Sequence, residues 1–398
     1  MPASHPLRVS FIVAALSMLA PFTLDTYLPS FPSIAADLMA TAEDMQRTLS
    51  DYLWAFGVMM LVYGPLSDAL GRRRVVLFAL LGYALASLGC ALANDIDTLV
   101  LMRVAQGLAA GAGLVIGRAL VRDLFEGAQA QKVSADVMLF FAIAPAIAPL
   151  VGGWLEGWFG WRAVFFFLSG IGLLVFALVA AWMPETLPKA QRQPIHPVLV
   201  LRAYGDMLRQ PSFMLLALMF GINFGGLFLY IAAAPELIYR HLGYGEHDFW
   251  RLFVPVVGGI VVGSFLAGRL AYRLTQPQSV GLGFALMIGA ALCNVVFAHL
   301  LPLSALTLVA PVALYALGMA LAMPALSLMG LELFPARRGM ASALQGFLQM
   351  SFNGLIAALL VVLLASSLQW LALGQLGIAL VSLALWGLWL ARHQAGKP

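Results

Sequence analysis

Long apolar runs separated by short polar segments cover most of the chain. Twelve such runs are found, at residues 9–32, 50–68, 74–94, 98–118, 134–154, 162–183, 212–234, 250–268, 279–298, 303–324, 340–364 and 369–391. A helix needs about 20 predominantly apolar residues to cross the hydrocarbon core of a bilayer. The pattern therefore predicts an all-α integral membrane protein with twelve transmembrane helices.

The longest polar stretch divides these runs into two groups of six. It covers residues 184–211, and we interpret it as a cytoplasmic linker between an N-terminal six-helix bundle at 1–183 and a C-terminal one at 212–398. Three positions recur in the two halves: Leu66, Leu70 and Arg73 correspond to Leu266, Leu270 and Arg273. Duplicated halves around a central substrate site are a recurrent plan of transporters.

The composition excludes several classes of protein. Of the 398 residues, 62% are hydrophobic and 10% are charged, whereas soluble domains carry about 25% charged residues. A soluble enzyme, a nucleic-acid-binding protein and a disulfide scaffold are therefore excluded. The two cysteines, Cys90 and Cys293, lie within apolar runs, where small-hydrophobe packing is expected of them.

The basic residues predict the orientation of the chain. With a cytoplasmic N-terminus, seventeen of the 22 lysines and arginines fall in cytoplasmic segments, four fall outside, and Arg103 lies within a span. Because positive charge accumulates in cytoplasmic loops, we expect both termini to be cytoplasmic. The net charge of +4 is then a topology signal that gives no support to a nucleic-acid partner.

A basic turn joins the second and third runs. It reads GPLSDALGRRR from Gly64 to Arg74. Gly71 permits a tight turn, Asp68 places an anion at a helix end, and the arginines, Arg72 and Arg73 among them, suit anionic lipid. We expect Asp68 to form a cytoplasmic latch with Arg118 and Arg122 that breaks during transport; a plain basic turn is the alternative.

Two ionisable residues lie inside predicted spans. An intramembrane acid is costly and therefore a functional candidate, which singles out Asp25. Counting 1.5 Å per residue from the outer surface places Asp25 about 10 Å deep and Arg103 about 8 Å deep. The two depths match, so we expect Asp25 to bind the transported proton, with Arg103 favouring its ionised form in one conformation. A purely structural ion pair is the alternative.

A polar stripe on the eleventh run is the main candidate for substrate contact. Ser342, Gln345, Gln349 and Asn353 share one helical face, which lines a pore or makes interhelical hydrogen bonds. We expect further side chains to complete a roomy substrate pocket, although they could equally be packing residues. They are Phe22, Tyr27, Phe140, Phe141, Asn223, Phe224, Phe228 and Tyr230.

Glycine and proline mark two spans as close and deformable. Small residues spaced four apart let neighbouring helices approach, and the fourth run holds Gly107, Gly111, Gly113 and Gly117. Proline removes a backbone donor and bends a helix, and the fifth run holds Pro145, Pro149, Gly152 and Gly153. We expect these segments to take part in the conformational switch; helix packing alone is the other interpretation.

These motifs together resemble a known family. GPLSDALGRRR resembles the signature loop of the major facilitator superfamily, with Ala69 in place of its usual basic residue. LVLMRVAQG at 99–107 resembles the buried-arginine motif of proton-coupled members, and APAIAPLVGG at 144–153 resembles the motif of the drug-antiporter branch. With LDTYLP at 24–29, RALVRD at 118–123 and GMASALQG at 339–346, the set is similar to the bicyclomycin/chloramphenicol-resistance (Bcr/CflA) efflux group.

The resemblance implies a transporter and not an enzyme. We expect a proton-coupled antiporter that exports small organic or drug-like compounds by alternating access, as in multidrug efflux and antibiotic resistance. A transporter for one metabolite, such as an amino acid or nucleoside-like compound, is the first alternative; a membrane receptor or scaffold ranks low because the loops are short. Expected partners are the substrate, protons and membrane lipid, with no partner subunit required.

No cofactor or metal is expected. The chain has no phosphate-binding loop for ATP, so the proton gradient would drive transport. His241, Glu246, His247 and Asp248 cluster in a predicted outer loop, where solvated loop chemistry is favoured over metal binding.

Overall fold

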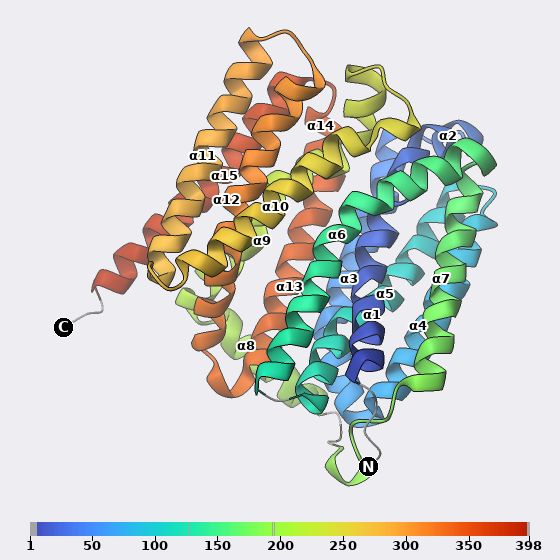
Figure 1. The fold of residues 1–398 in the computed structure, drawn as a ribbon, viewed down its shortest axis with the longest axis vertical. Coiled ribbons are helices and arrows are strands. Elements are labelled where there is room, and N and C mark those ends of the chain that lie inside the picture. Colours follow the sequence, from blue (N-terminus) through green and yellow to red (C-terminus); the bar gives the residue numbers. More distant parts are fainter. Residues whose placement is uncertain (1–5, 126, 193, 195, 396–398) are drawn as a thin grey trace. The chain divides into compact units, whose positions relative to one another are not determined.

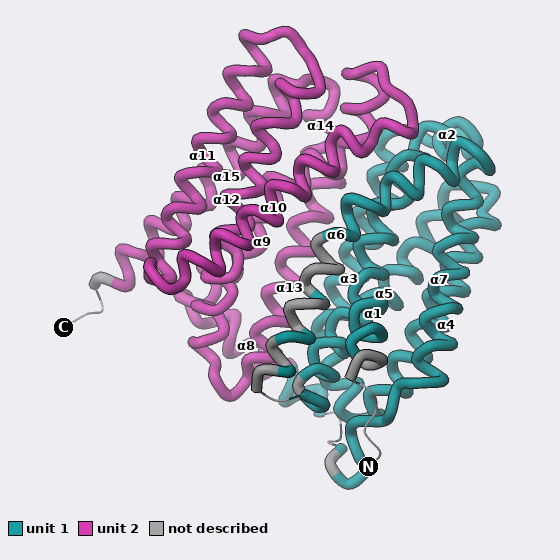
Figure 2. Tube along the Cα trace, in the orientation of Figure 1, with its two compact units in different colours: residues 1–200 teal, residues 201–398 magenta. Residues whose placement is uncertain are grey.

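The computed structural model describes residues 6–125, 127–192, 194 and 196–395; some side chains inside these ranges, most of them between 127 and 142, lie outside the description. Every regular element in these ranges is helical (Figure 1). The chain divides into two compact units, residues 1–200 and 201–398 (Figure 2). Each unit is treated by itself below.

Unit 1 is a bundle of long helices. Its elements are α1 (Pro6–Asp25), η1 (Leu28–Ser30), α2 (Phe31–Asp37), α3 (Ala42–Leu70), α4 (Arg72–Ala91), α5 (Ile96–Leu124), α6 (Gly127–Phe159), α7 (Trp161–Trp182) and the short η2 (Lys189–Gln191). Side-chain caps begin several of these helices: Thr41 and Asp44 cap each other's backbone N–H groups at α3, and Asp95 accepts the Thr98 N–H at α5. Such caps satisfy N–H groups that a helix start leaves unpaired.

Unit 2 is also built of long helices, and more short helical segments lie between them. After α8 (Pro197–Leu208), which crosses the unit boundary, come α9 (Pro211–Ala232), η3 (Glu236–His241), η4 (Glu246–Asp248), α10 (Trp250–Leu270), α11 (Gln276–Leu300), α12 (Ala305–Glu332), η5 (Pro335–Arg337), α13 (Arg338–Leu355), η6 (Ile356–Val361), α14 (Val362–Leu364) and α15 (Leu368–Ala395). Both η3 and η6 are π-helical, a geometry found mostly at functional positions.

The prediction of a helical membrane protein is confirmed. Eleven segments of the described residues are long and apolar enough to cross a bilayer. The predicted run at 134–154 falls within α6, a helix for which only part of the side chains are described. These positions match the twelve apolar runs of the sequence.

The two units repeat one packing pattern. In unit 1, α5 packs on α3, α4 and α1, α7 packs on α4 and α1, and α6 packs on α1. In unit 2, α12 packs on α10, α11 and α9, α15 packs on α11 and α9, and α13 packs on α9. Each of these contacts in unit 1 therefore has a counterpart six spans later in unit 2, as expected of a duplicated architecture.

The first apolar run, predicted at 9–32, lies within the candidate span Ser10–Asp37, and it is made of more than one helical segment. α1 ends at Asp25 and the chain continues through η1 and α2. The next backbone N–H that the Asp25 carbonyl would accept belongs to position 29, which is proline. Since proline has no N–H, the helix ends here, inside the candidate span Ser10–Asp37.

Glycines permit three close helix contacts in unit 1. A Cβ added at Gly107 would collide with the Tyr52 carbonyl of α3, and one at Gly113 would collide with α1. A Cβ added at Gly152 of α6 would overlap the Thr26 carbonyl. The glycine-rich segments predicted from the sequence therefore bring α5 and α6 directly against the backbone of α1 and α3.

Candidate functional site

Arg103 forms the centre of a buried polar cluster in unit 1. It lies on α5, and none of its surface is exposed to solvent. Its guanidinium carbon lies 4.2 Å from the ring centroid of Tyr27 and 4.3 Å from that of Tyr52. Both rings are also fully buried. A guanidinium over an aromatic face is attracted by the ring quadrupole, most strongly where water is absent.

Hydrogen bonds hold the same guanidinium from three sides. Nη1 donates to Gln106 Oε1 at 2.5 Å and to the Thr23 carbonyl of α1 at 3.4 Å. Nε donates to the Thr48 carbonyl of α3 at 3.3 Å. Gln106 in turn donates to Ser87 Oγ on α4 at 2.7 Å. Nη2 has no hydrogen-bond partner among the residues that the structure describes.

Asp25 is buried but is not paired with Arg103. It is 5% exposed at the end of α1, and no ion pair or hydrogen bond involves it in the described part of the chain. Asp25 lies two positions after Thr23, and two residues turn an α-helix by about 200°. The Thr23 hydroxyl bonds Tyr83 of α4 at 2.7 Å, so the carboxylate faces another side of α1. The matching depths predicted the same layer but not a contact.

Tyr27 and Phe22, both predicted to contact substrate, differ in burial. Tyr27 is fully buried, with its hydroxyl 3.2 Å from Thr48 Oγ1 and its ring packed on Phe31 and Phe165. Tyr27 therefore packs against the Arg103 guanidinium. Phe22 is half-buried. The side chains of two further candidates, Phe140 and Phe141, lie outside the described residues.

The basic turn is held by Asp68, which the sequence singled out, and by Asp123, whose role it did not indicate. Arg72 is 8% exposed and its guanidinium lies 2.6 Å from Asp68, 3.2 Å from Asp123 and 2.7 Å from Ser67 Oγ. Asp68 forms an ion pair with Arg72, four residues further along the chain, and the latch expected between Asp68, Arg118 and Arg122 stays a prediction. The Arg122 side chain lies outside the described residues.

The segment after α7 closes this turn. Glu185 accepts the backbone N–H of Arg72, the first residue of α4, at 2.9 Å and lies 3.5 Å from Arg192. Gly71 has φ of 101°, a conformation that favours glycine, and an added Cβ would collide with Glu185. Arg73 bonds the Ala180 carbonyl. An added Cβ at Gly64 meets nothing within 4 Å, so that glycine is not required by packing.

Three polar residues of unit 2 that were predicted from the sequence are buried. Asn223 on α9 donates to the Met319 carbonyl at 3.3 Å, and Gln345 on α13 exchanges hydrogen bonds with Ser327 of α12 at 3.2 and 3.4 Å. Asn353 is 1% exposed. The Oδ1 atoms of both asparagines have no hydrogen-bond partner among the described residues. Gln345 therefore joins two helices, whereas the asparagines keep free acceptors.

The aromatic candidates on α9 separate into two groups. Phe224 and Phe228 pack on each other at 6.2 Å. Tyr230 accepts a hydrogen bond from Asn294 at 2.6 Å, and Asn294 also donates to Gln375 at 2.7 Å. Gln349 of α13 is half-buried, with its backbone against Gly221 of α9.

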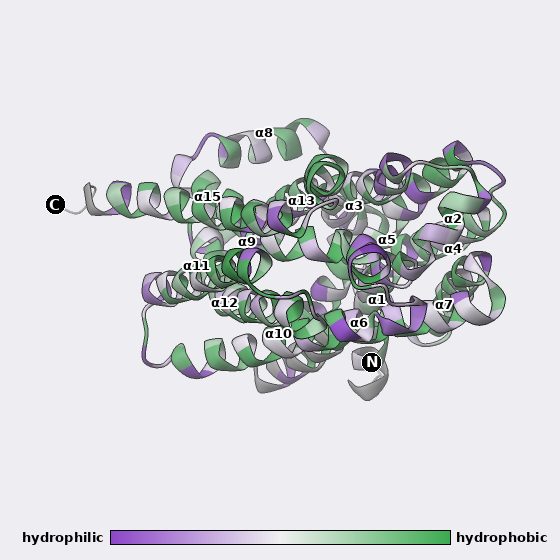
Figure 3. Cartoon of the chain, turned by 90° about the horizontal axis from the view of Figure 1, so that it is seen from above, coloured by the Kyte–Doolittle hydropathy of each residue, from purple (hydrophilic) through white to green (hydrophobic). Residues whose placement is uncertain are grey.

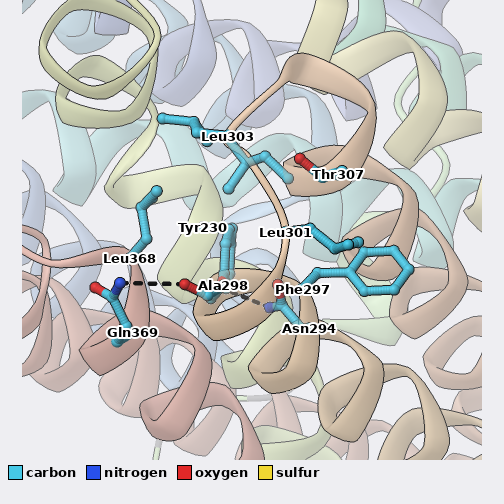
Figure 4. Close-up of a pocket in the computed structure, with 10 residues that line it drawn as sticks. Tyr230, Asn294, Phe297, Ala298, Leu301, Leu303, Thr307, Leu368 and Gln369 are labelled. Atoms are coloured by element: carbon cyan, nitrogen blue, oxygen red, sulfur yellow. Dashed lines mark hydrogen bonds between the residues drawn. The ribbon is translucent and has the colours of Figure 1, made fainter.

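Tyr230 also lines a cavity of about 180 Å³ within unit 2 (Figure 4). The cavity lies where α9, α11, α12 and α15 come together, and Figure 4 shows Gln369 bonded to the Ala298 carbonyl at its wall. Its lining residues are Tyr230, Asn294, Phe297, Ala298, Leu301, Leu303, Thr307, Leu308, Leu368 and Gln369. Asn294 was missed, although an amide inside an apolar run is a signal that could have identified it.

The remaining candidates lie on α6 and in the loop cluster around η3 and η4. α6 continues as a helix through Pro145 and Pro149, and Gly152 and Gly153 beyond them are buried. No group of three or more metal-ligating side chains occurs in the described part of the chain. His241 bonds the Ala365 carbonyl at 2.8 Å, and Asp248 bonds Arg251 at 2.8 Å, so these two members of the loop cluster have different partners.

A duplicated helical membrane protein with a buried cation in one unit and a basic turn between its second and third spans is typical of a secondary transporter. The sequence matches the family model described as Major Facilitator Superfamily over residues 13–358. The chain therefore belongs to the major facilitator superfamily of transporters. It is a transporter and not an enzyme, and its substrate is a small molecule.

Bacterial relatives support this assignment. The chain is 35% identical to the MFS-type transporter YdgK of Bacillus subtilis (strain 168) over 357 residues, 89% of this chain and 88% of that one. It is 32% identical to a bicyclomycin resistance protein homolog of Haemophilus influenzae over 271 residues, 68% of each chain. It is 31% identical to a chloramphenicol resistance protein of Pseudomonas aeruginosa over 369 residues, 90% of this chain and 85% of that one.

Solved structures show the same fold. The crystal structure of a D-xylose-proton symporter superposes with a TM-score of 0.73, covering 96% of this chain and 97% of that one. The sequences are 14% identical, so the likeness concerns the fold alone.

Proposed function

We propose that this protein is a proton-coupled exporter of small organic, drug-like compounds that works by alternating access. It would lie in the bacterial inner membrane with both termini cytoplasmic. Relatives named for resistance to bicyclomycin and chloramphenicol support export of such compounds. The observation that carries the proton coupling is Asp25, a buried carboxyl without an ion-pair or hydrogen-bond partner in the described residues.

Asp25 would carry the proton because its anion is poorly stabilised where it lies. A buried carboxylate without partners is costly, and it avoids that cost by binding a proton. Arg103 lies in the same unit, where two aromatic rings and two backbone carbonyls hold its guanidinium. A conformation that admits water to Asp25, or brings it to Arg103, would release the proton, and alternation between the two states would couple export to proton entry.

Unit 2 would supply hydrogen-bond acceptors for the substrate. Asn223 on α9 and Asn353 on α13 have buried Oδ1 atoms without partners in the described residues. A bound compound that offers N–H or O–H donors would satisfy both. Phe224, Phe228 and the half-buried Gln349 would contribute contacts from the same two helices.

The cytoplasmic cluster would act as the conformational switch. Arg72 joins Asp68 of α3 to Asp123 of α5, and Glu185 joins the start of α4 to the segment after α7. We expect this cluster to hold the cytoplasmic ends of unit 1 together in one state, and Pro145 and Pro149 of α6 to permit bending as it is released. The six-helix bundles at 1–183 and 212–398, joined by the linker at 184–211, would be the bodies that move.

Transport in proteoliposomes with an imposed pH gradient tests the proposal. We expect uptake of drug-like compounds to collapse on addition of an uncoupler, and Asp25→Asn to abolish gradient-driven uptake. Asp97→Asn is the matched control, because that carboxylate is 84% exposed and should leave uptake unchanged. Uptake that is insensitive to the uncoupler would refute proton coupling, and full activity of Asp25→Asn would refute the assignment of Asp25.

A second candidate function is transport of one dedicated metabolite. The amide side chains of unit 2 favour it, because oriented amides with free acceptors suit a polar substrate as well as a drug. A panel that includes amino acids and nucleosides distinguishes the two functions: one strongly preferred metabolite supports the second, and broad uptake of unrelated apolar compounds supports the first.

A further inference from the structure

The helix α8, between the two predicted bundles, has one face packed against protein. Ala203, Tyr204 and Met207 are 6%, 8% and 0% exposed, and they lie on one side of the helix by their spacing. Asp206 forms an ion pair of 3.5 Å with Arg337 of η5. The ion pair lies within unit 2, and the buried side chains define the rotation of α8 about its axis.

The opposite face of α8 is apolar and exposed. Val198, Leu201 and Leu208 are 61%, 69% and 48% exposed. At about 100° per residue these three side chains fall within a sector of about 80°, centred roughly opposite the buried face. We call them the α8 stripe. Water-facing apolar patches of this kind mark an interaction surface.

Positive charge flanks the α8 stripe on one edge. Arg202 and Arg209 are both exposed, and they lie about 100° and 80° around the axis from Leu201, next to Val198. An apolar sector bordered by arginines is the pattern of helices that lie in the membrane interface, where the side chains reach lipid phosphates.

The position of α8 along the chain brings it to a membrane surface. α8 ends at Leu208, and the candidate span Pro211–Ala232 begins three positions later. The two intervening residues reach at most about 7 Å. Seen from above, α8 lies outside the long helices of unit 2, at their margin (Figure 3), where a surrounding bilayer would be met.

We infer that α8 is an interfacial helix that binds the surface of an anionic bilayer. The α8 stripe inserts at the level of the lipid carbonyls, and Arg202 and Arg209 bind headgroup phosphates. The Asp206–Arg337 pair ties α8 to unit 2, and Met207 stays buried on the other side of the helix. The bilayer is favoured over a protein partner because α8 is tethered within two residues of a span and its edge charge is complementary to anionic lipid.

Depth measurements with a matched pair of positions test the inference. Leu199 is 58% exposed on the same helix, but it lies about 160° from Leu201 around the axis. Leu201→Cys and Leu199→Cys are each introduced into a full-length Cys293→Ala background, because Cys293 is exposed and Cys90 is buried. Each is labelled with the dye NBD in nanodiscs of phosphatidylcholine and phosphatidylglycerol, with and without a lipid nitroxide at acyl carbon 5.

We expect the nitroxide to quench the dye at Leu201→Cys at least threefold more strongly than at Leu199→Cys. Equal quenching of the two positions, or none at either, would overturn the inference. The inference would also be overturned if the dye at Leu201→Cys were shielded from solvent in a way that depends on protein concentration and not on the nitroxide. That result would assign this face of α8 to contact with a second copy of the chain.

A charge-removal variant tests the lipid preference. Each arginine near an anionic surface strengthens partitioning by about fivefold, so Arg202→Gln combined with Arg209→Gln should abolish the increase in quenching that phosphatidylglycerol produces. Arg392→Gln, an exposed arginine in the last turn of α15, is the control and should retain it. An unchanged response to phosphatidylglycerol in the double variant would refute the role of the two arginines.

Discussion

Replacing Tyr52 with leucine removes one of the two rings that hold the Arg103 guanidinium. Tyr52 and Arg103 are both fully buried, with 4.3 Å between the ring centroid and the guanidinium carbon. A desolvated cation–π contact contributes about 2 kcal/mol, and the smaller side chain leaves a cavity that adds about 1–2 kcal/mol. We therefore expect Tyr52→Leu to lower the free energy of unfolding by about 3–4 kcal/mol.

The conservative variant separates the ring from the hydroxyl. Tyr52→Phe keeps the aromatic face over Arg103, and the buried Tyr52 hydroxyl has no hydrogen-bond partner among the described residues, so this variant should change the free energy of unfolding by less than about 1 kcal/mol. Reversible unfolding in mixed micelles with increasing sodium dodecyl sulfate, followed by tryptophan fluorescence, measures both variants against the parent protein.

A double-mutant cycle isolates the cation–π contribution from the cavity. Tyr52→Leu is combined with Arg103→Met, and the expected coupling energy is about 2 kcal/mol. Tyr83 is the control ring: it is 1% exposed and bonds the Thr23 hydroxyl, but the guanidinium stacks on Tyr27 and Tyr52. Tyr83→Leu should couple to Arg103→Met by less. Equal coupling of the two tyrosines, or an equal loss in Tyr52→Phe and Tyr52→Leu, would refute this explanation of how the buried charge is held.

Three further predictions concern the scaffold. Gly152→Ala should destabilise the protein by about 1–3 kcal/mol because its Cβ overlaps α1, whereas Gly170→Ala, with nothing within 4 Å, should cause no loss in the same unfolding assay. Glu185→Ala leaves the first N–H of α4 without its hydrogen-bond acceptor, which should lower the free energy of unfolding by about 1 kcal/mol. It should also accelerate tryptic cleavage of the linker, and unchanged cleavage would contradict this role of Glu185. The backbone N–H of Thr98 lowers the pKa of Asp95. The Asp95 carboxylate should therefore stabilise α5 fully above about pH 4 and lose this effect as the pH falls further. Hydrogen exchange in the first turn of α5 should then become equally fast in the parent protein and in Asp95→Ala at acid pH.

The number, order and pairing of the spans follow from the sequence because each depends on one-dimensional information. A bilayer imposes a fixed length on every apolar run, and the duplicated order of runs implies duplicated contacts. The broken first span is the exception. Apolar content continues through residues 26–32, and only the missing N–H of Pro29 ends α1 at Asp25.

Side-chain partners were harder to predict because they depend on rotation about helix axes. The depths of Asp25 and Arg103 were counted along two helices, but depth does not specify which side of α1 carries the carboxylate. Asp68 likewise binds Arg72, four residues away, where a more distant latch was expected. Glu185 lies in the polar linker and shows no pattern in the sequence, because its role arises from the return of the chain to α4 after α7.

The end of α1 connects the two ionisable residues without a contact between them. The last carbonyls of a helix lack intrahelical donors and carry its negative end charge. Arg103 uses one of them, the Thr23 carbonyl, and a cation at this end of the helix is stabilised. The same end charge disfavours an anion at Asp25, the last residue of α1. One helix terminus thus meets Arg103 through the Thr23 carbonyl and carries Asp25 as its last residue, so the two ionisable residues are connected through α1 and not through a contact of their own.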